Sequence, residues 1–217
     1  MGAFESKAWI DQYAEWTDPY PETGSDTLVA WFNQCVANNP KAKATWFMGK
    51  ELTYEQLNRQ VGRCASALRK LGVGKGDRVA VALPNCPQHI IGVTAILRLG
   101  ATVVEHNPLY TAAELEPQFA DHGAKVAIVF DKSAPTFTAL REVTQLEHIV
   151  SVNMIEAMPL HLQAALAIPL PPLSKQRNEL TAPAPGTTPW KQFVDSGTRT
   201  VHGAAVTPDD TAFILYT

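Results

Sequence analysis

Histidine and cysteine side chains could ligate a metal ion, but their spacing in this sequence predicts no metal centre. The six histidines are His89, His106, His122, His148, His161 and His202. Metal sites show paired His or Cys residues a few positions apart, and no such pair occurs among them. The three cysteines, Cys35, Cys64 and Cys86, are also widely spaced. We therefore expect reduced, buried thiols in a cytoplasmic protein.

Three side chains that could move protons or bind a ribose follow predicted strands directly. They are Glu105, His106 and Asp131. His106 could act as an acid or a base near neutral pH. No carboxylate or nucleophile is paired with it in the sequence, so a hydrogen-bonded loop histidine is favoured over a catalytic one, and Glu105 is interpreted in the same way. Asp131 suits either a ribose-binding acid or a helix cap, and we favour the cap.

The glycine-rich run from Gly72 to Asp77 resembles a phosphate-binding loop but stands in the wrong context. It follows a predicted helix and precedes a strand, whereas a phosphate binds at the N-terminus of the helix that follows such a loop. We interpret it as a helix-to-strand turn that uses positive backbone φ angles. The sequence also contains no P-loop motif and no Gly-x-Ser-x-Gly motif, which argues against P-loop NTPases and serine hydrolases.

The elements that must position these residues alternate between buried strands and amphipathic helices. A helix over 25–38 with an apolar face precedes a hairpin of 44–48 and 51–54 around a Gly49-Lys50 turn. Thr53 and Gln56 predict a capping box. The remaining strands and helices are expected at 78–83, 87–99, 101–104, 111 onward, 125–130, 137–143 and 148–152. Apolar strands separated by helices predict a parallel sheet flanked by helices.

Ligands bind beyond the carboxyl ends of the strands in such a sheet. The loops at that edge are therefore the first candidates for a site: Pro84 to Pro87, Glu105 to Tyr110, and Asp131 to Ser133. The chain is 46% hydrophobic and 18% charged, and its 217 residues suffice for a core. Its net charge of -3 argues against a nucleic-acid partner, which would need excess positive charge.

The chain divides by composition into four predicted parts. Residues 1–24 form an N-terminal arm, 25–155 an α/β subdomain, 156–189 a proline-rich insertion, and 190–217 the start of a further segment. Seven prolines interrupt the insertion, in which only Leu160 to Ile168 is expected to be helical. A helix over 190–194 follows, and the chain closes on an apolar strand over 211–217. Because no turn or polar tail follows this strand, we expect a truncation.

Several runs together resemble the opening of the acyl-adenylate-forming (AMP-binding) superfamily. They are Leu52-Thr53-Tyr54-Glu55-Gln56-Leu57, the run from Leu71 to Ala80, Leu83-Pro84-Asn85, Leu97-Arg98-Leu99-Gly100-Ala101, Asn107-Pro108-Leu109-Tyr110-Thr111 and Asp209-Asp210-Thr211. Asn-Pro-Leu-Tyr and the later Pro189-Trp190 pair are most similar to the long-chain fatty acid-CoA ligases. The resemblance implies an incomplete N-terminal domain of an acyl-CoA synthetase-like fold.

The resemblance also implies a two-step reaction of a fatty acid with ATP, Mg²⁺ and coenzyme A. The acid forms acyl-AMP, and the acyl group then passes to the thiol of coenzyme A. Tyr216 and Thr217 match the residues just before the family's phosphate-binding loop, Ser-Gly-Thr-Thr-Gly, and are the only cofactor-binding residues carried over. That loop is not among the 217 residues, so we expect the chain alone to be inactive and assign no catalytic residue and no metal ligand.

Two other classes of function fit the same elements. One is a stand-alone α/β module that binds a small ligand without ATP chemistry, which separate titrations of ATP, fatty acid and coenzyme A would reveal. The other is an interaction protein, for which a defined oligomer would be the evidence. The apolar run from Leu160 to Ile168 could also rest weakly on a membrane surface or simply pack on the domain.

Overall fold

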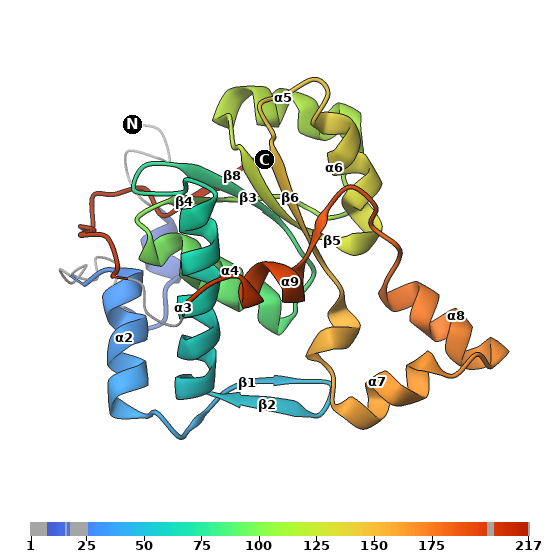
Figure 1. Ribbon diagram of the computed structural model, residues 1–217. Helices are drawn as coiled ribbons and strands as arrows, with labels where there is room; N and C mark the ends of the chain where they lie inside the picture. The colour runs from blue at the N-terminus through green and yellow to red at the C-terminus, as the bar shows by residue number, and fades with distance from the viewer. Residues whose placement is uncertain (1–7, 16, 18–25, 199–201, 217) are drawn as a thin grey trace.

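The computed structural model describes residues 8–15, 17, 26–198 and 202–216. Its centre is a six-stranded sheet in which every neighbouring pair is parallel (Figure 1). The strands, in spatial order, are β7 (Thr188–Pro189), β6 (His148–Val152), β5 (Val126–Phe130), β3 (Arg78–Ala82), β4 (Thr102–Glu105) and β8 (Phe213–Leu215). The predicted α/β fold with a parallel sheet is confirmed.

Helices cover both faces of this sheet because alternate strand residues point to opposite sides. Val79, Val81 and Ile128 pack in one apolar cluster with α3 (Tyr54–Lys70), α4 (Pro87–Arg98) and α9 (Trp190–Asp195). Ala80 and Val129 pack in a second cluster with α5 (Ala112–His122) and α6 (Ala134–Leu140). The central strands are therefore buried on both sides, as near-continuous apolar runs predict.

The predicted hairpin is present, but its turn is one residue earlier than expected. β1 (Lys43–Phe47) pairs with β2 (Lys50–Thr53) in antiparallel fashion, and Lys50 already pairs with Phe47. The turn is therefore Met48-Gly49 and not Gly49-Lys50. Met48 has φ of 50° and Gly49 has φ of 92°, and two positive φ angles are what the tight hairpin turn that matches strand twist requires.

Two predicted helices begin at other residues than the sequence pattern indicated. α2 (Leu28–Asn38) begins after Thr27, whose hydroxyl accepts a hydrogen bond from the Ala30 N–H at 3.2 Å. Its apolar residues are not buried, and Trp31 is 66% exposed. α6 begins at Ala134 and not near Phe137, because Pro135 fits the first turn of a helix better than a preceding loop.

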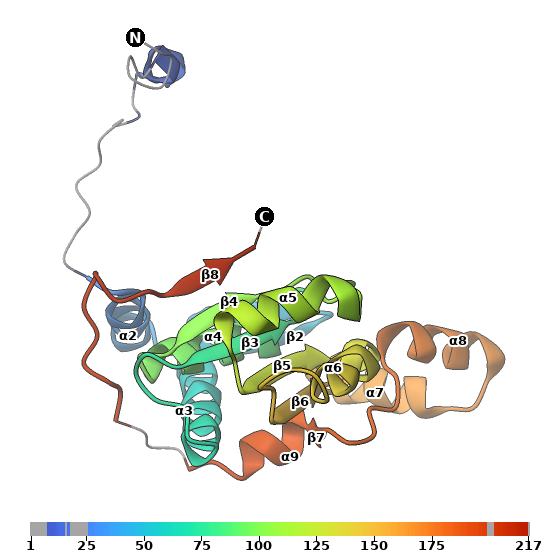
Figure 2. The ribbon, with the colours of Figure 1, turned by 90° about the horizontal axis from the view of Figure 1, so that it is seen from above.

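The proline-rich stretch contains two helices where one was predicted. α7 (Leu160–Ala167) is followed by α8 (Pro171–Leu180), and together they project from one side of the molecule (Figures 1 and 2). We call residues 160–180 the α7–α8 arm. The sequence pattern predicts that the paired prolines at 171 and 172 break a helix, but they occupy the first turn of α8, where no backbone N–H is needed.

The last described segments return to the sheet. β7 pairs with β6, α9 packs on α3, and β8 pairs with β4. The predicted N-terminal arm over 1–24 falls mostly outside the described residues, which there form only η1 (Ala8–Gln12). The proposed boundaries at residues 155 and 189 remain predictions. Among the described residues, no helix combines the length and the apolar character needed to cross a bilayer.

Candidate functional site

The carboxyl ends of the parallel strands meet at one edge, and the predicted loops gather there. His106 follows β4, and its backbone N–H donates to the Val81 carbonyl at the end of β3. Tyr216 follows β8, the strand that pairs with β4. The rings of His106 and Tyr216 are nearly parallel, with centroids 6.0 Å apart. The structure thus joins the candidate histidine to the residue that the family resemblance singled out.

His106 is buried and fully hydrogen-bonded, as the sequence interpretation favoured. Its Nδ1 lies 2.9 Å from Gln118 Oε1 and its Nε2 lies 3.2 Å from His122 Nε2. The two histidines are only 5% and 3% exposed. Burial lowers the pKa of both rings, and the neighbouring His106 helps to lower that of His122, to about 4. The partners on α5, Gln118 and His122, were not predicted.

Tyr216 is held by its hydroxyl as well as by its ring. The hydroxyl donates to Asp121 Oδ2 at 2.6 Å. Burial and the Asp121 carboxylate raise the pKa of Tyr216 to about 12, so the phenol is neutral at physiological pH. Thr217, the other predicted cofactor-binding residue, lies outside the described residues.

The two carboxylates singled out by sequence have structural partners. Glu105 Oε1 lies 2.9 Å from His89 Nε2, which links the end of β4 to α4. Asp131 is the first residue of η2 (Asp131–Ser133) and is buried. Its carboxylate accepts a hydrogen bond from the Thr181 hydroxyl at the end of α8, and burial raises its pKa. The expectation of a helix cap was therefore wrong: Phe130 and Ser133 stand at the N-cap positions of η2 and α6, and the Asp131 side chain bonds Thr181.

The glycine-rich run is a structural turn, as interpreted. Gly72 and Gly76 have φ of 88° and 85°, which glycine adopts without strain. The Asp77 carboxylate accepts a hydrogen bond from the Gly74 N–H at 2.8 Å, and the Gly76 N–H donates to the Gly100 carbonyl. These contacts close the loop on itself and on the start of β4.

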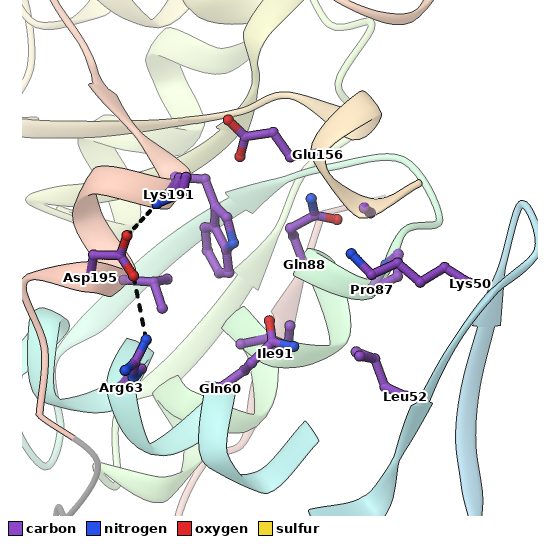
Figure 3. A pocket seen from close by; sticks show the side chains of 13 residues that line it. Lys50, Leu52, Gln60, Arg63, Pro87, Gln88, Ile91, Glu156, Lys191 and Asp195 are labelled. Carbon is purple, nitrogen blue, oxygen red and sulfur yellow. Dashed lines mark hydrogen bonds and ion pairs between the residues drawn. The ribbon is translucent and has the colours of Figure 1, made fainter. Parts of the chain in front are cut away.

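A cavity of about 260 Å³ lies on the other face of the sheet (Figure 3). It is bordered by Pro87 and Gln88 beyond the end of β3, and by Glu156 beyond the end of β6. Trp190 forms part of its apolar lining. On its rim, Asp195 bonds Lys191 at 2.6 Å and Arg63 at 3.4 Å. Burial raises the pKa of Glu156.

Sequence reasoning placed only the Pro84–Pro87 loop near this cavity. Its other lining residues come from β2, α3, α4, α9 and η3 (Met154–Ala157), most of which are far apart in the chain. Within the described residues, no three His, Cys, Asp or Glu side chains are close enough to hold a metal ion.

The amino-acid sequence is similar to curated fatty acid ligases. It is 33% identical over 153 residues to the long-chain-fatty-acid–CoA ligase of Bacillus subtilis, which covers 70% of this chain and 27% of that protein. The ligase of the same name from Escherichia coli O6:H1 is 35% identical over 152 residues, covering 68% and 27%. The chain therefore spans about a quarter of the length of these relatives.

The fold is that of solved CoA ligases. A long-chain-fatty-acid-CoA ligase from Archaeoglobus fulgidus has a TM-score of 0.67 at 20% identity, covering 94% of this chain and 37% of that one. An anthranilate CoA ligase has a TM-score of 0.70 at 20% identity, covering 88% and 32%. The family model described as AMP-binding enzyme matches residues 32–217, which is most of the sequence. The chain belongs to the AMP-binding enzyme family.

Proposed function

We propose that the chain is the N-terminal part of a long-chain fatty acid-CoA ligase. A carboxylate oxygen of the fatty acid attacks the α-phosphorus of ATP, the bond to the β-phosphate breaks, and acyl-AMP and pyrophosphate form. The thiolate of coenzyme A then attacks the acyl carbon and AMP leaves. The observation that carries the proposal is the 33–35% identity to two fatty acid ligases over about two thirds of the chain.

This part of the protein would supply the sheet on which the nucleotide site is built. Tyr216 and Thr217 are proposed as the edge of that site, since ligands of parallel sheets bind beyond the carboxyl ends of the strands. Mg²⁺ would neutralise the triphosphate, with ligands from outside the described residues. The three cysteines are free, which supports a cytoplasmic protein. Cys64 and Cys86 are buried as expected, but Cys35 is only half-buried.

We also propose that the protein contacts a membrane surface peripherally. Long-chain acids partition into bilayers, and the α7–α8 arm carries exposed apolar side chains. Leu160 is 81% exposed and Leu170 is 53% exposed, and Ile168 is exposed as well. Leu166, by contrast, is buried and is not available to lipid. The contact would be weak, because one short helix buries little apolar surface.

A chimera tests the ligase proposal directly. The chain replaces the corresponding residues of the Bacillus subtilis ligase, and pyrophosphate release is measured with ATP, Mg²⁺, coenzyme A and either palmitate or benzoate. Palmitate-dependent release and formation of palmitoyl-CoA are expected, with benzoate a poor substrate. The chain assayed alone is the control, for which no release above background is expected. A folded chimera that binds ATP but consumes no fatty acid would contradict the proposal.

A further inference from the structure

The hydrogen bonds around the buried histidine pair determine where each ring carries its proton. The Ala124 N–H donates to His122 Nδ1 at 3.0 Å, so the proton of a neutral His122 is on Nε2. That Nε2–H faces His106 Nε2 at 3.2 Å. His106 accepts there and carries its own proton on Nδ1, which donates to Gln118 Oε1 at 2.9 Å. All four ring nitrogens are thus satisfied when both rings are neutral.

An additional proton has no acceptor in this arrangement. On His106 it would occupy Nε2 and face the Nε2–H of His122, and on His122 it would occupy Nδ1 and face the Ala124 N–H. A donor that faces a donor in a buried site loses a hydrogen bond and leaves a group unsatisfied. Protonation must therefore separate the rings or turn one of them.

Charged groups from three elements act on the pair, and a neutral phenol lies beside it. From β3, the Arg78 guanidinium donates to the His122 carbonyl and disfavours a positive ring. From β4 and α5, the Glu105 and Asp121 carboxylates favour a positively charged ring. Just after β8, Tyr216 contributes a neutral phenol. Burial is the largest influence on both rings and lowers their pKa values.

The pair is the packing surface for Tyr216, the residue that follows β8. The Tyr216 ring lies 6.0 Å from the His106 ring at an interplanar angle of 10°, and 6.1 Å from the His122 ring. β8 is a three-residue edge strand whose Phe213 and Leu215 are exposed. Apart from its ladder with β4, the end of this strand is therefore fixed mainly by Tyr216 on the histidines and on Asp121.

We propose that His106 and His122 are positioning residues: as a neutral, hydrogen-bonded pair they hold the ring of Tyr216, and a proton on the pair releases it. The functional consequence would be a nucleotide-site edge whose geometry depends on pH. This consequence rests on the proposed function. The holding of Tyr216 itself does not depend on that function.

Nuclear magnetic resonance on the 217-residue chain, with labelled histidine and tyrosine, tests whether the histidine pair holds the Tyr216 ring. At about pH 7.5 we expect the two neutral tautomers deduced above and proton-proton contacts between the rings of Tyr216 and His106. These contacts should disappear as the pH falls through about 4, the lowered pKa of His122. The amide signals of β5 report whether the fold survives.

Two substitutions of His122 give matched controls. His122→Gln places an amide donor where the imidazole Nε2–H lies but cannot gain a proton, so the contacts of Tyr216 should persist at both pH values. His122→Asn keeps an acceptor for the Ala124 N–H but is too short to reach His106, so the contacts should weaken even at pH 7.5. Contacts that are independent of pH in the wild type, or equally acid-sensitive in His122→Gln, would overturn the proposal. If a variant does not fold, the wild-type titration still decides.

The chimera described above separates this inference from the proposed function. In it, His122→Asn should raise KM for ATP several-fold with little change in KM for coenzyme A, and His122→Gln should restore the wild-type value. An inactive parent chimera would count against the ligase function, whereas the magnetic resonance result would stand. An unchanged KM for ATP in an active His122→Asn chimera would overturn the functional consequence.

Discussion

The centre of the parallel sheet and the α7–α8 arm are stabilised in opposite ways. In the centre, Ile128 on β5 is completely buried between layers of helices. On the arm, only Leu166 is buried. The arm is instead tied at its C-terminal end by polar contacts, since Lys132 Nζ donates to the Asn178 and Glu179 carbonyls at 3.0 and 3.2 Å. Long-range apolar packing therefore fixes the body, and a few hydrogen bonds fix the arm.

The largest expected effect tests the apolar half of this comparison. Ile128→Ala should lower the free energy of unfolding by about 4 kcal/mol, because it removes buried methyl groups and leaves a cavity that the sheet cannot close. Leu160→Ala on the arm is the control and should change it by less than about 0.5 kcal/mol. Urea denaturation of the chain measures both. Similar losses in the two variants would show that the arm is as well packed as the body.

The second effect concerns the buried histidines of the body. The pKa of His122 is lowered to about 4, so the unfolded chain, with an ordinary value of about 6.5, binds the proton first. The contribution of His122 to stability is therefore constant above about pH 6.5 and falls as the pH drops toward 4, by up to about 3 kcal/mol.

Urea unfolding at a series of pH values measures this loss. His122→Gln is the control, and its stability should fall much less over the same interval. An identical pH profile for the two proteins would show that other groups cause the acid sensitivity.

The same contrast explains which parts of the fold could be predicted. Strands such as β5 are apolar runs bounded by polar residues, so local pattern alone indicates them. Pro171 and Pro172, which start α8, have no such local meaning, because proline both breaks a helix and begins one. The position of the hairpin turn depended on backbone angles at Met48 that residue type does not indicate.

The candidate site could be predicted only in part. The position of His106 after a strand placed it at the carboxyl edge, and the resemblance pointed to Tyr216. Gln118 and His122 are four residues apart and share a helix face, but the sequence could not show that this face packs on His106. The cavity residues come from elements far apart in the chain, so only the folded chain brings them together.

Helix caps on the body give a smaller effect. The Thr53 hydroxyl accepts from the Gln56 N–H at 3.3 Å, whereas the Thr111 hydroxyl donates to Glu114 Oε2 at 2.8 Å. Thr53→Ala and Thr111→Ala should each destabilise the chain by about 1 kcal/mol. In the active chimera, Thr111→Ala should lower the melting temperature with little effect on turnover.

The pH dependence of the two cap variants should differ. The N–H and hydroxyl of Thr111 lower the pKa of Glu114, so this cap stabilises above the carboxylate's unfolded pKa and is lost as the pH falls below it. The effect of Thr111→Ala should therefore shrink in acid, while that of Thr53→Ala should not. A large drop in turnover at unchanged melting temperature would instead make the loop from Asn107 to Thr111 a substrate contact.

The smallest expected effect is the binding of the arm to lipid, measured by flotation with neutral and anionic liposomes. Leu160→Glu/Leu170→Glu should float less than the wild type, because it places charges on the exposed apolar side chains of the arm. Leu109→Glu/Val143→Glu is the matched control, since both residues are exposed on the body, and it should float like the wild type. The net charge of -3 gives no attraction to anionic lipid, so binding should persist in high salt, which screens charges but not apolar burial. Equal flotation of the two double variants, or binding that disappears in salt, would mean that the arm packs or is solvated without contacting a membrane.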